Sequence, residues 1–176
     1  MEIRISQRLN DILGYAREEA IRTGRYAIGA DHLALGILRD ADNDACKSLA
    51  ELGIDAAGLK SFIDAGISSG KIVPFCDSDR IAVGRSAESA INLAAMEALK
   101  AGQAEVSPAH LLLAISRMAD SVCSDFLAGA GVTAERLAAL MKERHYLSNS
   151  VKTVTPSPDE IKHIIRISDG NSKIYS

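Results

Sequence analysis

Apolar residues recur every three or four positions along most of the first 147 residues, the spacing of helices that bury one face. The first stripe begins after Ser6, a predicted N-cap, and ends at Gly24, a residue suited to the position just past a helix. Between Asp31 and Arg39 the apolar residues leave little room for a polar face, which predicts a central buried helix.

Cap signals divide the following stretch into two more helices. Asp42 is predicted to cap a third helix that runs to Leu52, where Gly53 ends it. Asp55 is predicted to cap a fourth helix, from residue 56 to about residue 65. The first 65 residues therefore predict four short helices.

The same pattern returns 78 positions later without a gap. The matched residues include His32 and His110, Glu19 and Glu97, Gly24 and Gly102, Gly53 and Gly131. Matched glycines, histidines and glutamates over nearly sixty positions indicate a tandem duplication. We expect repeat one at about residues 6–65, a linker at 66–83 and repeat two at about 84–146.

Repeat two carries cap signals of its own. Ser86 is predicted to cap a helix over residues 87–101, and Ser107 followed by Pro108 opens the next one. Ser121 and Thr133 are predicted to begin the last two helices. The fold class is therefore all-α: two pseudo-symmetric four-helix repeats packed into one globular domain over residues 1–147.

The remaining segments differ in composition from the repeats. The linker is rich in Gly, Ser and Asp and is predicted to hold at most a short extended piece at 71–75. Residues 148–176 contain Ser, Asn, Thr and two prolines at first, which indicates a flexible tail. A short helix is expected over 158–167, because Ile161, Ile164 and Ile165 share one helical face.

Composition narrows the classes of partner. Apolar residues make up 47% of the chain but aromatic residues only 4%, which favours closely packed helices. The net charge of −3 gives no reason to expect nucleic acid or an anionic membrane as a partner. No apolar run approaches the roughly 18 residues that cross a bilayer. The start of the chain lacks the pattern of a secretion signal, so a cytoplasmic location is expected.

One stretch has carboxylates at the spacing of a calcium-binding loop. Asp40, Asp42, Asp44 and Glu51 match loop positions 1, 3, 5 and 12. Position 6, however, is Ala45, where such a loop needs glycine for its sharp turn. Helix capping explains these aspartates better, and no metal site is predicted.

The matched polar residues are candidates for a shared role. Two histidines, His32 and His110, are too few ligands for a structural zinc ion, and a local hydrogen bond within a buried helix is the better interpretation. Glu19 and Glu97 are each expected to pair with a cation of their own repeat. We treat these four residues as structural signatures of the repeat.

No catalytic motif or cofactor-binding motif is present in the sequence. It has no phosphate-binding glycine loop, no nucleophile elbow and no zinc-protease motif. Cys46, Cys76 and Cys123 form no Cys-x-x-Cys pair and are expected to be reduced, mostly buried side chains. The chain is therefore predicted to be neither an enzyme nor a cofactor-binding protein.

Three motifs together resemble a known family. They are Ala-x-x-Glu-Ala from Ala16, the run Ile-Gly-x-x-His-Leu-x-Leu-Gly-Ile-Leu from Ile28, and Leu-x-x-Leu-Gly-Ile from Leu49. They resemble the Clp N-terminal repeat domain, which stands at the front of ClpA- and ClpC-type AAA+ unfoldases. The resemblance covers about residues 6–141 and implies a docking module for substrates or adaptor proteins, with a Clp unfoldase or protease core as partner.

The resemblance also implies a ligand site. In ClpC-like members, a carboxylate before the histidine takes the guanidinium of a phosphorylated arginine, and a hydroxyl at the first helix helps to hold the phosphate. Repeat one offers Asp31 and Ser6 at these positions, whereas repeat two offers Ala109 and Gly84. We therefore expect at most one weak phosphoarginine site, in repeat one.

Other readings of the function stay open. Because no nucleotide-binding module follows the repeats in this sequence, the chain is expected to be free-standing, the alternative being a piece of a longer unfoldase. By analogy with accessory proteins of similar architecture, a free-standing chain is expected to bind the Clp core or ring and to modulate it. A small helical enzyme or metal-binding protein would use His32, His110 and the aspartates around residue 42. An unrelated helical solenoid is disfavoured, because two units of 78 residues are too few and too long.

Overall fold

The stripe after Ser6 forms a helix in the computed structural model, which describes residues 4–148. Ser6 Oγ accepts a hydrogen bond from the Leu9 N–H at 3.0 Å, and Gly24 ends the helix with a left-handed φ of 78°. The helices of repeat one are α1 (Gln7–Thr23), α2 (Ala30–Arg39), α3 (Asp44–Glu51) and α4 (Ala56–Ile67).

Repeat two follows the same plan after a connector that holds a short 3₁₀ helix, η1 (Phe75–Arg80). Its helices are α5 (Arg85–Lys100), α6 (Pro108–Ser116), α7 (Val122–Gly129) and α8 (Ala134–Glu143). Each of them begins 78 residues after its counterpart in repeat one. The prediction of four helices per repeat in an all-α fold is thus confirmed.

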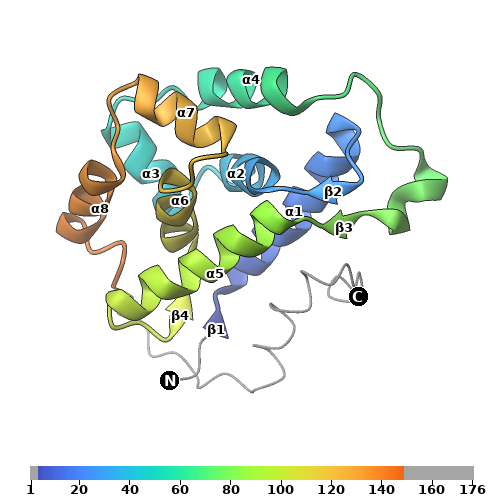
Figure 1. Cartoon of the computed structure of the whole chain (residues 1–176). Helices are drawn as coiled ribbons and strands as arrows, with labels where there is room; N and C mark the ends of the chain where they lie inside the picture. Colours follow the sequence, from blue (N-terminus) through green and yellow to red (C-terminus); the bar gives the residue numbers. More distant parts are fainter. Residues whose placement is uncertain (1–3, 149–176) are drawn as a thin grey trace.

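Short parallel strands join the two repeats in a reciprocal way (Figure 1). The strand before α1, β1 (Arg4–Ile5), pairs with the strand before α6, β4 (Glu105–Val106). The strand before α2, β2 (Ala27–Ile28), pairs with the strand before α5, β3 (Ala82–Val83). Each repeat therefore brings the start of its first helix to the start of the other repeat's second helix, which a single repeat could not do alone.

The second helix of each repeat lies inside the molecule (Figure 1). Helix α2 packs against α1 of its own repeat and against α5 and α6 of the other, and α6 is buried along nearly its whole length. Helices α4 and α7 pack together across the repeats, where the rings of Phe62 and Phe126 lie 5.3 Å apart. One continuous core therefore spans both repeats.

Two predicted caps are wrong. Asn43, and not Asp42, caps α3, because Asn43 is buried and its side chain bonds both Cys46 N–H and the Ile37 carbonyl. Gly84, and not Ser86, precedes α5, because the Gly84 N–H extends the β3 pairing to the Ile28 carbonyl and the helix then begins at residue 85. The other predicted caps, Asp55, Ser107, Ser121 and Thr133, stand at the N-termini of α4, α6, α7 and α8.

The connector and the tail also differ from the sequence-based picture. Residues 71–74 have no regular structure, and the 3₁₀ helix η1 was not predicted. The expected tail helix at 158–167 lies outside the described residues. Within residues 4–148, no helix combines the length and the apolar character needed to cross a membrane.

Candidate functional site

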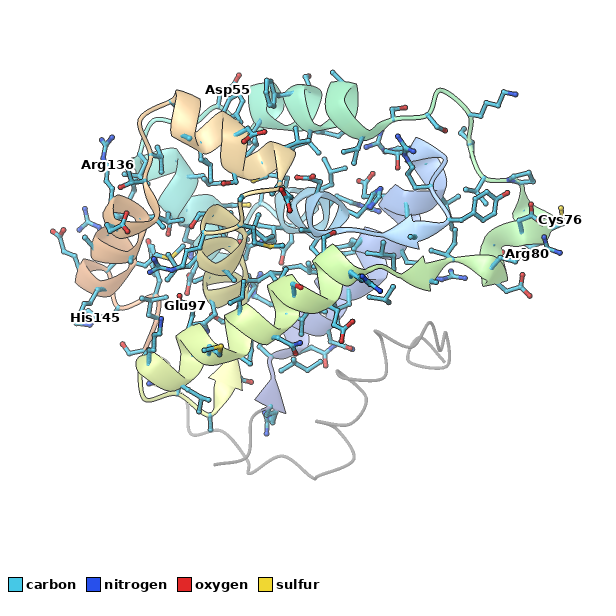
Figure 2. All side chains as sticks on the ribbon, viewed as in Figure 1. Asp55, Cys76, Arg80, Glu97, Arg136 and His145 are labelled. Atoms are coloured by element: carbon cyan, nitrogen blue, oxygen red, sulfur yellow. The ribbon has the colours of Figure 1, made fainter. Side chains whose placement is uncertain are left out.

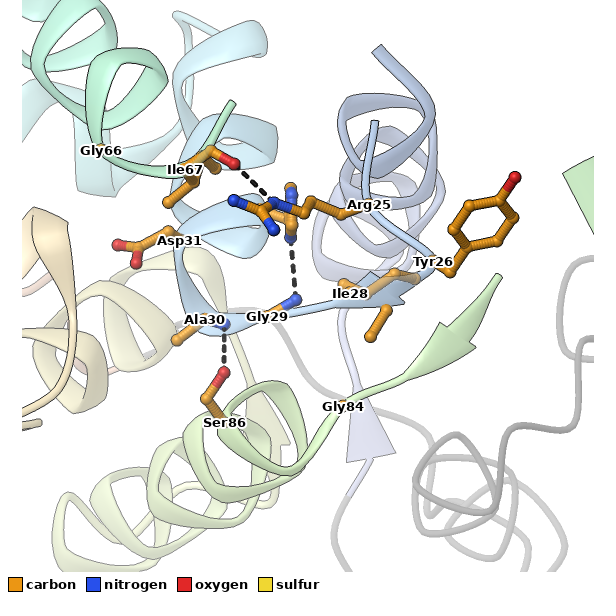
Figure 3. A pocket seen from close by; sticks show the side chains of 12 residues that line it. Arg25, Tyr26, Ile28, Gly29, Ala30, Asp31, Gly66, Ile67, Gly84 and Ser86 are labelled. Atoms are coloured by element: carbon orange, nitrogen blue, oxygen red, sulfur yellow. Dashed lines mark hydrogen bonds between the residues drawn. The ribbon is translucent and has the colours of Figure 1, made fainter. Parts of the chain in front are cut away.

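A pocket of about 520 Å³ opens at the N-terminus of α2 and is here called the α2 pocket (Figure 3). Its walls come from the start of α2, the strand β2, the end of α4 and the start of α5. The residues used below are Arg25, Tyr26, Gly29, Asp31, His32 and Ser86. The pocket therefore forms only where the two repeats meet.

Ser86 completes the start of α2 from the other repeat. Its Oγ accepts a hydrogen bond from the Ala30 N–H at 3.0 Å, and the Gly29 N–H donates to His32 Nδ1 at 2.9 Å (Figure 3). The first two amides of this helix end therefore already have acceptors. This role of Ser86 could not be predicted from the sequence, because only the pairing of β2 with β3 brings Ser86 to α2.

Asp31 is directed away from Arg25 and toward α7 (Figure 3). Its carboxylate accepts hydrogen bonds from Ser121 Oγ at 3.0 Å, from Val122 N–H at 3.1 Å and from Cys123 N–H at 2.9 Å. A negative charge at a helix N-terminus is favourable, so Asp31 caps α7 across the repeats. A carboxylate has about four acceptor positions, so these three bonds leave it capacity for one more donor.

A second pocket, of about 320 Å³, lies at the N-terminus of α6 and is here called the α6 pocket. Five of its lining residues stand 78 positions from lining residues of the α2 pocket: Ser6, Arg8, Ser107, Pro108 and His110. The two pockets are therefore equivalent sites of the duplicated unit. Arg8, Asp44 and Lys47 make the α6 pocket the more polar of the two.

The two residues predicted to form one phosphoarginine site line different pockets. Ser6 caps α1 and lines the α6 pocket, next to Ser107 and His110. Asp31 lines the α2 pocket, together with Gly84 and Ser86. The strand pairing explains the exchange, because each first helix starts beside the second helix of the other repeat. A phosphoarginine role for either residue stays a prediction.

Both signature histidines are buried and make the local hydrogen bond expected for them. His32 Nδ1 accepts from Gly29 N–H, and its Nε2 lies 2.9 Å from Thr23 Oγ1. His110 Nδ1 accepts from Ser107 N–H, and its Nε2 lies 3.0 Å from the Leu147 carbonyl. Burial lowers the pKa of His32 to about 4, and burial also lowers the pKa of His110. Both rings are therefore neutral at pH 7.

Glu19 and Glu97 are buried as well, and each pairs with cations of its own repeat. Glu19 accepts from Arg22, whose guanidinium also binds Asp64 on α4 at 2.7 Å. Glu97 pairs with Arg117, the C-cap residue of α6, at 2.7 Å and with Lys100 at 3.8 Å. The two carboxylates therefore hold neighbouring helices together in each repeat.

The acidic stretch around residue 42 is engaged with cations. Arg8 pairs with Asp40 at 2.9 Å and with Asp42 at 3.5 Å, and Glu51 pairs with Arg144 at 3.0 Å. Within the part of the chain that the structure describes, no three His, Cys, Asp or Glu side chains lie in an arrangement suited to a metal ion. These aspartates therefore act in ion pairs and at the start of α3.

The cysteines differ in exposure, which corrects the expectation that they are mostly buried. Cys123 is buried and Cys46 half-buried, whereas Cys76 is exposed on η1. Figure 2 shows Cys76 and Arg80 at one end of the molecule, with Arg136 and His145 at the other. Burial raises the pKa of Cys46 to about 11 and that of Cys123 to about 12, so neither thiol is a nucleophile at neutral pH.

Comparison with known proteins places these features in a family. Residues 4–130 match the family described as the Clp repeat (R) N-terminal domain. The chain is 31% identical over 130 residues to "Negative regulator of genetic competence ClpC/MecB" of Bacillus subtilis (strain 168), which covers 74% of this chain and 16% of that protein. It is 29% identical over 130 residues to "Chaperone protein ClpB" of Oceanobacillus iheyensis, with the same coverage.

A solved structure shares the fold. It is described as "Preliminary structural investigations of a malarial protein secretion system", and its TM-score to this chain is 0.66 at 21% identity. The match covers 82% of this chain and 97% of the solved one. The curated relatives are much longer proteins, and the matched region spans about one sixth of their length.

Proposed function

Because the chain belongs to the Clp repeat (R) N-terminal domain family, we propose that it is a non-catalytic protein-binding module of the Clp system. In this proposal it recognises substrates or adaptor proteins for an AAA+ unfoldase in the cytoplasm. The described surface also exposes several large apolar side chains, which suits contact with other proteins.

The observation that carries the proposal is a set of exposed apolar side chains on and beside the connector, here called the connector face. It consists of Tyr26, Ile72 and Phe75, whose exposed fractions are 45%, 70% and 94%. The Tyr26 hydroxyl donates to Asp77 at 2.7 Å, which ties β2 to η1 at this place. Aromatic side chains in a small cluster supply much of the binding energy of protein interfaces. The connector face is therefore the proposed docking surface.

Binding of the purified chain to three immobilised partners tests this proposal: a ClpC-type unfoldase, the Clp peptidase core, and a permanently unfolded protein. We expect Phe75→Asp to weaken binding at least about tenfold, as loss of an aromatic anchor does. Met96→Asp is the matched control, because Met96 is also exposed (53%) but lies on α5, and its affinity should stay within about twofold. Absence of binding to all three partners would falsify the proposed function.

We also propose that the α2 pocket is where a phosphorylated arginine would bind. Asp31 supplies a carboxylate for the guanidinium, and the Ser86 hydroxyl at the start of α5 lies in the same pocket. Only weak binding is expected, since Asp31 already holds α7. Titration with free phosphoarginine should shift the amide NMR signals of residues 31 and 86. Shifts confined to Ser6 and His110 would assign the ligand to the α6 pocket instead.

A further inference from the structure

The C-terminal end of α1 in repeat one is joined to α4 by an ion pair. Arg22 on α1 pairs with the buried Glu19 of its own helix, and its guanidinium also lies 2.7 Å from the Asp64 carboxylate on α4. Opposite charges therefore face each other across these two helices, and each is satisfied within the repeat.

The equivalent positions of repeat two hold two cations. Lys100 on α5 stands at the position of Arg22. Lys142 on α8 stands at the position of Asp64. The Glu97 carboxylate lies as far as 3.8 Å from the Lys100 ammonium group, and Lys142 forms no ion pair within residues 4–148. Repeat two therefore has two like charges where repeat one has an ion pair.

A groove of about 720 Å³ opens between α5, α6 and α8 at this place, and both lysines line it. Its apolar lining includes Leu113, which is buried in the core. Three further lining residues are apolar where repeat one has the polar residues Lys60, Ser61 and Ser69: Ala138, Ala139 and Leu147. The groove thus combines an apolar floor with ammonium groups on its rim.

The lining of the groove is more cationic than the chain as a whole, whose net charge is −3. With histidine counted as neutral, the charged lining residues are three cations and two carboxylates: Lys100, Arg117, Lys142, Glu97 and Glu135. Arg117 lies 2.7 Å from Glu97 and neutralises the more buried of the two carboxylates. The groove lies at the opposite end of the molecule from η1 (Figure 1), so it is separate from the connector face.

We propose that this groove binds an acidic segment of a partner protein. A carboxylate of the partner lies between Lys100 and Lys142, as the Asp64 carboxylate lies beside Arg22 in repeat one. An adjacent apolar side chain of the partner packs on Leu113. This proposal rests on the proposed function and names the chemistry of one partner, but it uses a different surface from the connector face.

NMR of the full-length chain with three short synthetic peptides, blocked at both ends, tests the proposal. The acidic probe is Ser-Leu-Glu-Glu-Leu-Ser, and the other two carry Gln or Lys in place of both Glu residues. We expect the acidic peptide to shift the Leu113 methyl and Ala138 amide signals, and to bind at least about fivefold more tightly than the Gln peptide at low salt. The difference should shrink as the ionic strength rises, and the Lys peptide should not bind.

Lys142→Asp restores the charge pattern of repeat one, because the new carboxylate can pair with Lys100. This variant should bind the acidic peptide at least about fivefold more weakly. Lys60→Asp is the matched control, since it makes the same charge change at an exposed position of α4 outside the groove, and its affinity should stay within about twofold.

Four results would overturn the proposal. The first is equal affinity for the acidic and Gln peptides, and the second is an equal loss in the two variants. The third is a set of shifts confined to Ile72 and Phe75, which would move the acidic segment to the connector face and leave the proposed function standing. The fourth is a change of the groove signals when the chain alone is diluted and its mass falls, which would assign the groove to a second copy.

Discussion

The two repeats share one plan but stabilise the start of their third helices differently. In repeat one, Asn43 caps α3 and also donates to the Ile37 carbonyl, so the cap is complete within its own repeat. In repeat two the equivalent residue is Ser121, which is shorter and bonds to Asp31 across the repeats. The counterpart of Asp31 is Ala109, which has no polar side chain. The longer capping residue, Asn43, is therefore found together with Ala109, and the shorter one, Ser121, together with Asp31.

The crossing of the first two helices shows a second exchange of this kind. Gly36 on α2 faces Ile12 on α1, and a Cβ on Gly36 would lie 2.8 Å from the Ile12 carbonyl oxygen. In repeat two the equivalent residues are Ala114 and Ala90, both buried. At this crossing, repeat one combines isoleucine with glycine, whereas repeat two has alanine at both positions. The two repeats thus share the backbone plan, while the paired side chains at this crossing differ.

The largest expected effect concerns the buried histidines. The pKa of His32 is lowered from 6.5 to about 4 in the native state. His32 therefore binds a proton below pH 6.5 in the unfolded chain, but only below about pH 4 in the folded protein. His32 leaves the free energy of unfolding unchanged above pH 6.5, and its burial lowers that free energy by about 3 kcal/mol as the pH falls to about 4. Urea unfolding at several pH values measures the loss.

His32→Asn, which keeps an acceptor for the Gly29 N–H, should flatten this pH dependence. His110→Asn should flatten it less, because the hydrogen bond to the Leu147 carbonyl opposes the effect of burial on the His110 pKa. If the free energy of unfolding depended on pH equally in the wild type and in His32→Asn, the pH dependence would not come from the lowered pKa of His32.

Asp31→Ala should lower the free energy of unfolding by about 2 to 3 kcal/mol, because it removes three hydrogen bonds at the start of α7. Asp55→Ala is the matched control, since Asp55 caps α4 on the exposed surface within its own repeat, and it should cost only about 1 kcal/mol. Urea unfolding of both variants gives the two values. Similar losses would show that the cross-repeat cap adds nothing beyond an ordinary cap.

Gly36→Ala should cost about 1 to 2 kcal/mol, because the added methyl group meets the backbone of α1. Gly14→Ala is the control in α1, where a Cβ meets nothing within 4 Å of the described residues, and it should stabilise the chain by up to about 1 kcal/mol. Thermal unfolding measures the difference, because Gly36→Ala should lower the Tm and Gly14→Ala should raise it. Stabilisation by both substitutions would exclude a tight crossing at Gly36.

The smallest effect separates the three thiols by labelling rate. Cys76 should react with a thiol reagent at once in the native protein, because it is exposed. Cys46 should follow more slowly and Cys123 last, because burial raises the pKa of Cys123 further and covers it more completely. Mass spectrometry after timed quenching gives the order, and early labelling of Cys123 would contradict its burial between the repeats.

The helices could be predicted because their signals are local. The caps Ser6 and Asp55 and the stop at Gly24 act within one turn of the chain, and the structure confirms them. The caps of α3 and α5 were wrong for opposite reasons. Asp42, Asn43 and Asp44 are all good capping residues, so burial alone selected Asn43. Ser86 has the side chain of a capping residue, but the β2–β3 pairing places the start of α5 before it, and its hydroxyl instead accepts from the Ala30 N–H of α2.

The site was harder to predict than the helices. The sequence identified Asp31 and Ser6 and the family's pattern placed them in one repeat, but strand pairing across the repeats sends them to separate pockets. No signal along the chain reveals that exchange, since two-residue strands have no recognisable pattern. The hydrogen bonds of Asp31 to α7 were likewise hidden, because the partners are about 90 positions apart.

By itself, then, the sequence determined the duplication, the eight α-helices within residues 4–148 and the burial of α2 and α6, because periodicity and caps act over a few residues. The tertiary structure alone decided which helix ends meet, which carboxylate serves which helix, and which apolar side chains remain exposed. These depend on contacts between residues far apart in the chain, and such contacts exist only after the two repeats have packed against each other.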